Sequence, residues 1–115
     1  MPADHRRRLG ADGEAQAAAW YEARGYVVLE RNWRCREGEL DLVLANGATI
    51  VFCEVKTRTS TRFGVPAEAV TVAKQRRIRM LAARYLAASP HRRASVRFDV
   101  VAVLGRKIDV IEAAF

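Results

Sequence analysis

Residues 39–56 read ELDLVLANGATIVFCEVK, and this stretch decides the fold. Over residues 39–44, Glu39 and Asp41 alternate with Leu40, Leu42 and Leu44, which is typical of a half-buried strand. Asn46-Gly47 is the strongest short turn signal in the chain, and the apolar run 49–56 after it predicts a returning strand. The stretch therefore predicts an antiparallel hairpin.

The predicted hairpin brings charged side chains to one face of the sheet. A two-residue turn at Asn46-Gly47 sets Asp41 opposite Phe52. In the same register, Glu39 faces Glu54. Opposite residues share a face, and the face repeats every two residues along a strand. Three acidic residues and a lysine should therefore gather on that face: Glu39, Asp41, Glu54 and Lys56.

Three carboxylates and a lysine are poor material for a core, because burying unpaired charges is costly. The cluster fits a solvated face, a set of ion pairs with lysine and arginine, or a cation site. Ligands that are all oxygen suit a hard cation such as magnesium.

The rest of the chain predicts two helices and three further strands. Asp12 is expected to cap a helix over residues 13–24, and a long helix is expected over 71–88. The further strands are expected over 26–33, 96–104 and 107–111. The order helix, three strands, helix, two strands favours one α/β domain over 11–115 with a mixed sheet, because the long helix can serve as a crossover. Residues 1–10 are polar and basic, and we expect a mobile tail there.

Glu14 lies early in the first predicted helix, on one stripe with Ala18 and Tyr21. That stripe should face the sheet, which would bring Glu14 to the rim of the core beside the acidic cluster. The alternative is that Glu14 complements the helix dipole, as acids in a first turn do.

The net charge of +7 favours a nucleic-acid partner, since 17 of the 20 basic residues are arginines and arginine matches phosphate bidentately. Solubility and a compositional bias of the gene are the alternatives. Phosphate contacts are expected from the loop after the hairpin and from the long helix, unless these side chains are merely solvated. The residues are Arg58, Arg62, Arg76 and Arg77.

Several classes of protein are disfavoured. No apolar run approaches the roughly 20 residues that span a bilayer. No apolar stretch follows the basic residues 5–8, so we expect no secretory signal and a cytoplasmic location. Cys35 and Cys53 lack the spacing of a zinc site. His5 and His91 lie outside ordered-looking segments, which disfavours a serine or cysteine nucleophile.

Asp41 followed by Glu54-Val55-Lys56 at a strand end resembles the D…(D/E)xK signature of restriction-endonuclease-like nucleases. From about residue 10 to 115, the chain is similar to the YraN-type family of small bacterial proteins. The matching segments are Gly13-Glu14-Ala15, Gly25-Tyr26, Arg31-Asn32, Gly38-Glu39-Leu40-Asp41-Leu42, Phe52-Cys53-Glu54-Val55-Lys56, Lys74-Gln75-Arg76-Arg77-Ile78, Arg97-Phe98-Asp99-Val100-Val101 and Ala114-Phe115.

The resemblance implies a restriction-endonuclease-like fold close to that of archaeal Holliday-junction resolvases, with magnesium or manganese held by acids. It implies that Asp41 and Glu54 are metal ligands and that Lys56 positions the attacking water and steadies the phosphate. Glu14 matches the helix-one glutamate of such nucleases, as a third catalytic acid and metal ligand. Gln75 matches an auxiliary polar residue of the site.

These observations predict a metal-dependent endonuclease that hydrolyses phosphodiester bonds in DNA, branched DNA included. One alternative is a nucleic-acid-binding module with a vestigial site and no catalysis. Another is a purely structural or partner-binding protein whose acids pair internally with arginines. Resolvase-like enzymes need two sites to cut two strands, which favours a homodimer.

Overall fold

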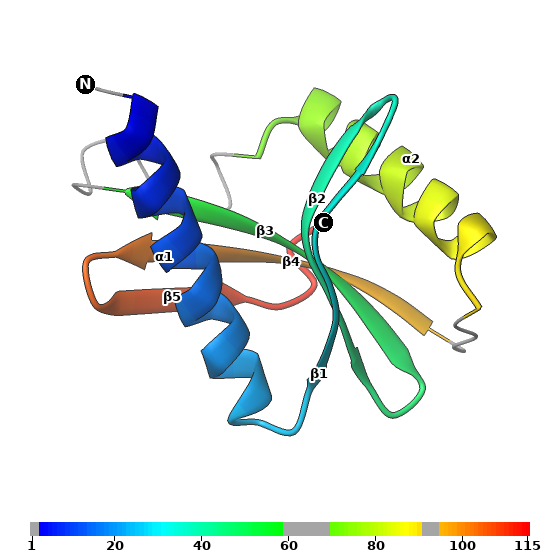
Figure 1. Ribbon diagram of the computed structural model, residues 1–115. Helices are drawn as coiled ribbons and strands as arrows, with labels where there is room; N and C mark the ends of the chain where they lie inside the picture. Colours follow the sequence, from blue (N-terminus) through cyan, green and yellow to red (C-terminus); the bar gives the residue numbers. More distant parts are fainter. Residues whose placement is uncertain (1–2, 59–69, 91–94) are drawn as a thin grey trace.

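The structure is a computed structural model that describes residues 3–58, 70–90 and 95–115, without the side chains of residues 3–11 and Arg58 (Figure 1). The elements, in chain order, are α1 (Ala3–Glu22), β1 (Val27–Cys35), β2 (Gly38–Asn46), β3 (Thr49–Arg58), α2 (Val72–Ala88), β4 (Ser95–Leu104) and β5 (Lys107–Ile111). This is the predicted order of helices and strands. It forms an α/β fold consistent with the restriction-endonuclease-like class.

The five strands form one mixed sheet in the order β1-β2-β3-β4-β5. β3 and β4 are parallel, and the other neighbours are antiparallel. A parallel pair needs a long crossover, and α2 supplies it, as the sequence predicts. Consequently β3 lies in the middle of the sheet, and its carboxyl end carries Glu54 and Lys56.

The two helices cover opposite faces of the sheet, because inward side chains alternate along the central strands. α1 packs Ala17, Ala18 and Tyr21 on Val51 and Cys53. α2 lies on the other face, where the buried side chains are Ile50, Phe52, Ile78, Leu81, Ala82 and Tyr85. The predicted inward stripe of α1, through Ala18 and Tyr21, is confirmed.

The first helix begins at Ala3 rather than at residue 13. Asp12 therefore lies inside α1 and is not its cap, so that expectation was wrong. Residues 3–12 contain three arginines, a leucine and two alanines, which have high helix propensity and can extend a helix before a local capping signal. That residues 1–10 form a mobile tail stays a prediction. Within the described ranges, no helix is both long and apolar enough to cross a membrane.

The hairpin between β2 and β3 forms as predicted, but in a different register. Asn46 pairs with Thr49, and Val43 rather than Asp41 lies opposite Phe52. The turn residues are Gly47 and Ala48, with Gly47 at a positive φ of 56° in the first central position, which glycine occupies in a type II′ turn. The shift is an even number of residues, so the paired side chains of Leu42 to Asn46 keep their predicted faces.

The regular alternation of β2 breaks at Asp41. Leu42 packs beneath α1, but Leu40, which should share its face, packs in the α2 cluster. The pairing of β2 with β3 ends at Leu42 and Cys53, and the far end of β2 curls toward α2 (Figure 1). A Cβ built on Gly38 would lie 3.3 Å from the Leu81 side chain. The sheet therefore opens between β2 and β3 at Asp41.

Candidate active site

Asp41 and Glu54 face each other where the two strands part, one step beyond the last pair, Leu42 and Cys53. The backbone N–H of Val55 donates to Asp41 Oδ2 at 2.8 Å, so the Asp41 side chain replaces a strand partner there. The Glu54 carboxyl lies close enough for its charge to act strongly on Asp41. The break in β2 thus places the Asp41 carboxyl beside that of Glu54.

Burial and the negative charge of Glu54 raise the pKa of Asp41 to about 7, although the Val55 N–H acts to lower it. Two carboxyl groups in contact cannot both ionise easily, and a shared proton relieves the repulsion. A divalent cation would relieve it in the same way. Near neutral pH a cation would therefore compete with a proton for the pair.

Glu54 is buried, with 9% of its surface exposed, and it contacts two lysines. Its Oε1 lies 2.8 Å from Lys74 Nζ and 3.4 Å from Lys56 Nζ. Burial and a hydrogen bond to Lys74 lower the pKa of Lys56. Burial acts against the charged form of Lys74, but its hydrogen bonds to Glu54 and Lys56 outweigh burial and raise its pKa. Two amines and two carboxyls therefore form one coupled cluster.

Sequence reasoning missed Lys74, although it lies next to Gln75 in one of the matching segments. Thr71 caps α2 and accepts from the Lys74 N–H at 3.2 Å, which puts Lys74 in the first turn, beside the end of β3. The Gln75 amide instead donates to the Val70 carbonyl at 3.1 Å and so binds the start of its own helix. A role for Gln75 in the site stays a prediction.

Glu14 lies near this pair but is not part of it. Burial raises the pKa of Glu14, and the charges of Glu39 and Glu54 add to the rise, while a hydrogen bond from Asn32 opposes it. Asn32 has a left-handed backbone with φ of 52°, and such strain often marks a functional position. Over the described residues, no three histidine, cysteine or acidic side chains gather closely enough to hold a metal.

The predicted register placed Glu39 opposite Glu54, and the structure does not. Glu39 lies opposite Arg34 of β1 and forms an ion pair with it, with Glu39 Oε2 at 3.2 Å from Arg34 Nε. That expectation was wrong because the register of the hairpin moved. The structure therefore brings together Asp41, Glu54, Lys56 and Lys74, with Glu14 at their edge.

The donor set of Asp41 and Glu54 fits magnesium or manganese. Magnesium is commonly held by one or two carboxylates, and water and substrate phosphate oxygens complete its shell. Burial and the negative charge of Glu54 raise the pKa of Asp41, so the Asp41 carboxyl lies in an environment that a cation would stabilise. Two protein carboxylates, with Glu14 near them, suffice for a site of this kind.

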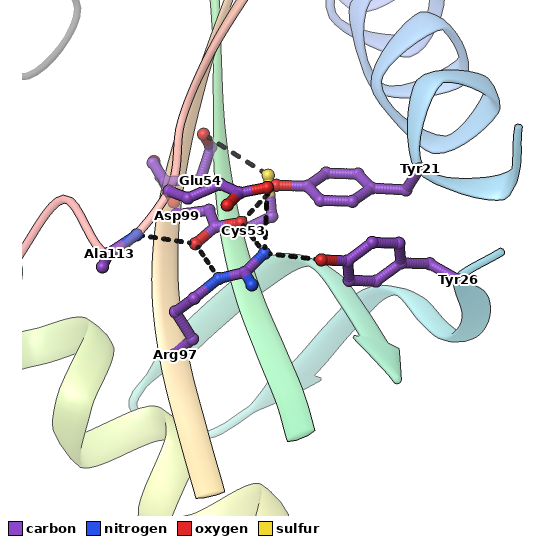
Figure 2. Close-up of polar contacts among 8 residues, drawn as sticks. Tyr21, Tyr26, Cys53, Glu54, Arg97, Asp99 and Ala113 are labelled. Atoms are coloured by element: carbon purple, nitrogen blue, oxygen red, sulfur yellow. Dashed lines mark hydrogen bonds and ion pairs between the residues drawn. The ribbon is translucent and has the colours of Figure 1, made fainter. Parts of the chain in front are cut away.

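A second polar cluster lies beneath α1 and supports the strands of the site (Figure 2). Asp99 of β4 is fully buried and accepts from Arg97 at 2.8 Å through both of its oxygens. It also accepts from the Tyr21 hydroxyl at 2.7 Å and the Ala113 N–H at 3.0 Å. These bonds join α1, β4 and the C-terminal segment behind β3. Sequence reasoning assigned Asp99 no role, although it lies in a matching segment.

Cys53 lies between the two clusters and is 3% exposed. Burial raises the pKa of its thiol, so little reactive thiolate forms. Cys53 therefore packs as a core side chain beneath α1.

The structure describes the side chains of two of the four arginines that are predicted to contact phosphate. Arg76 and Arg77 are exposed on α2, and neither forms an ion pair with any residue of the described ranges. The side chain of Arg58 and all of Arg62 lie outside the described residues. Binding of nucleic acid by these four arginines stays a prediction.

Comparison with known proteins gives consistent matches. The model of the uncharacterised protein family UPF0102 matches residues 13–103. The UPF0102 protein of Frankia alni is 63% identical over 95 residues, which cover 83% of this chain and 79% of the relative. That of Beutenbergia cavernae is 58% identical over 96 residues, covering 84% and 81%. That of Rhodococcus opacus is 51% identical over 100 residues, covering 87% and 85%. The matched range includes the whole candidate site.

Proposed function

This chain belongs to the UPF0102 family, whose name states no activity, and we therefore propose a function from its site: a divalent-metal-dependent endonuclease that hydrolyses phosphodiester bonds in DNA. The observation that carries the proposal is the contact between Asp41 and Glu54 beside Lys56, at the point where the sheet opens. Placing two acids in contact is unfavourable in itself, and unfavourable local arrangements are common at functional sites.

Each residue has a role that follows from its position. Asp41 and Glu54 would hold the cation, and Glu14 would bind one of its water ligands or join it directly. A bound magnesium ion would acidify a water molecule and neutralise charge on the phosphate. Lys56 contacts Glu54 from the same strand, so its ammonium lies where it can stabilise charge on the reacting phosphate. Enzymes lower such barriers by roughly 8–23 kcal/mol, to which these interactions contribute together.

One observation favours the alternative, a nucleic-acid-binding module that does not cut. Glu54 is already neutralised by two lysines, so the cluster can exist as a set of internal ion pairs. The arginines Arg76 and Arg77 would then bind phosphate without catalysis. A purely structural role with acids paired to arginines is less well supported, because the partners of Glu54 are lysines.

The experiment that tests the proposal is cleavage of a panel of labelled linear, nicked, flapped and four-way-junction DNAs, with magnesium, manganese or EDTA. We expect metal-dependent cutting by the parent and none by Asp41→Asn, Glu54→Gln or Lys56→Ala, with DNA affinity largely retained. Asp109→Asn, an exposed acid on β5, is the matched control and should cut like the parent. Salt-sensitive binding without cutting would establish the alternative.

Cutting both strands of a duplex requires two sites, so we propose that the protein acts as a homodimer, in the cytoplasm where DNA is accessible. Sedimentation velocity at the concentrations that support cleavage tests the oligomeric state. A monomer that cuts both strands in one binding event would contradict the dimer and leave the site intact.

A further inference from the structure

Two ammonium groups reach the same oxygen of Glu54 from different elements. Lys56 lies two residues along β3, on the same face as Glu54, and its Nζ is 3.4 Å away. Lys74 comes from the first turn of α2, and its Nζ is 2.8 Å away, the closer of the two. Lys74 therefore makes the shorter, charge-assisted hydrogen bond to the proposed metal ligand.

The two lysines differ in how easily their ammonium groups can move away from Glu54. The Lys74 side chain is 36% exposed, and that of Lys56 is 19% exposed. Lys56 is also fixed by its position on a central strand, paired on one side with β4. Lys74 can turn its flexible side chain to water while α2 stays in place, because Thr71 and Gln75 hold the start of that helix. Lys74 is thus the lysine that can be displaced.

We propose that Lys74 is an internal substitute for the divalent cation, occupying Glu54 in the metal-free protein and withdrawing when a cation binds. The inference rests on the proposed function, since it takes Asp41 and Glu54 as the metal ligands. A cation on Glu54 would compete with Lys74 for the same oxygen and would be repelled by its ammonium group. Both effects weaken cation binding, so Lys74 sets the concentration at which the site loads.

The test is Mg²⁺ and Mn²⁺ binding measured by isothermal titration calorimetry, without DNA. Lys74→Met keeps the length of the side chain and removes its charge. We expect it to bind both cations about tenfold more tightly, as loss of one competing charge-assisted hydrogen bond implies. Lys74→Gln should also bind them more tightly. Lys74→Arg, which keeps the charge, should remain near the parent.

Arg84→Met is the matched control, because Arg84 also forms an ion pair from α2, with Glu37 at 3.4 Å. It should leave cation affinity unchanged. If the parent binds cations and the Met and Gln variants bind them equally or more weakly, Lys74 is not a substitute for the cation, and the metal site stands. If the parent, the Lys74 variants and Asp41→Asn all bind none, the metal site and the inference both fall.

Discussion

The site depends on Asp41, because its side chain both accepts a backbone hydrogen bond from β3 and supplies one of the two facing carboxyl groups. The Asp41 side chain accepts the Val55 N–H where the β2–β3 pairing ends, and the negative charge of Glu54 acts on it from the facing strand. The first interaction fixes its position, and the second places a like charge beside it. Asp41 is therefore held in an unfavourable contact by the strand that carries Glu54.

The pKa of about 7 for Asp41 predicts a fall in metal-free stability as the pH rises. Between its ordinary value near 4 and about 7, the folded chain keeps a proton that the unfolded chain has released, so each step up in pH favours unfolding. Above about 7 the loss is complete. Asp41→Asn cannot titrate, and urea unfolding in EDTA from pH 5 to 8 should show a smaller fall for it. Asp109→Asn should follow the parent; parallel curves for Asp41→Asn and the parent would contradict the assignment.

At the scale of residues, sequence reasoning found the acids but not all of their partners. Glu54 and Lys56 share a face because the face of a strand repeats every two residues. Asp41 lies opposite Glu54 in the observed register, although the alternation of β2 breaks there. Lys74 and Asn32 were missed for a physical reason. The contact of Lys74 depends on how α2 docks, and the left-handed backbone of Asn32 depends on the curl of β1 and β2.

At the scale of elements, the hairpin was predicted and its pairing was not. A glycine with positive φ serves either central position of a primed turn, so Asn46-Gly47 and Gly47-Ala48 are both chemically reasonable loops. The structure has the Gly47-Ala48 turn, which places Val43 opposite Phe52 in the core beneath α2. Packing of side chains against the helix, rather than the turn signal alone, thus decides the register.

The contact of α1 with β3 predicts an effect of Gly13→Ala. A Cβ at Gly13 would overlap Thr57 Oγ1, so either the Thr57 side chain or α1 must shift. Alanine gains about 1 kcal/mol of helix propensity, but overpacking costs about 1–3 kcal/mol. We expect a net loss of stability in urea unfolding, relieved in Gly13→Ala/Thr57→Ala. Stabilisation by Gly13→Ala, as propensity alone predicts, would show that the contact is not tight.

The Asp99 cluster predicts unequal effects of two tyrosine substitutions. Tyr21→Phe removes a donor to a fully buried carboxylate and should destabilise the protein by about 1–3 kcal/mol. Tyr26→Phe is the matched control. It removes only an acceptor of the partly exposed Arg97, at 3.0 Å, and should cost less. Chemical denaturation compares them, and an equal or larger loss for Tyr26→Phe would argue against the anchoring of α1 through Asp99.

At the scale of the whole molecule, the charge of +7 predicts salt-dependent binding to duplex DNA. With about four to six phosphates contacted, the logarithm of affinity should fall with the logarithm of salt concentration with a slope of about −4 to −5. Arg76→Ala and Arg77→Ala should each reduce the slope by about 1. Arg84→Ala should change it less, because Arg84 is paired with Glu37. Fluorescence anisotropy measures the slope, and a flat response would argue against nucleic acid as the partner.

The measurement that tests the central claim most directly is the thermal unfolding of the parent, Asp41→Asn and Glu54→Gln, with and without magnesium at constant ionic strength and pH 8. At ten times the dissociation constant, magnesium should stabilise the parent by about 1.4 kcal/mol, a shift of several degrees. Both variants should lose most of that shift. Without metal, Asp41→Asn should be as stable as the parent or more stable, because the substitution relieves the repulsion with Glu54. No response to magnesium in the parent, together with clear destabilisation of both variants, would contradict a cation site and show that these acids serve the fold instead.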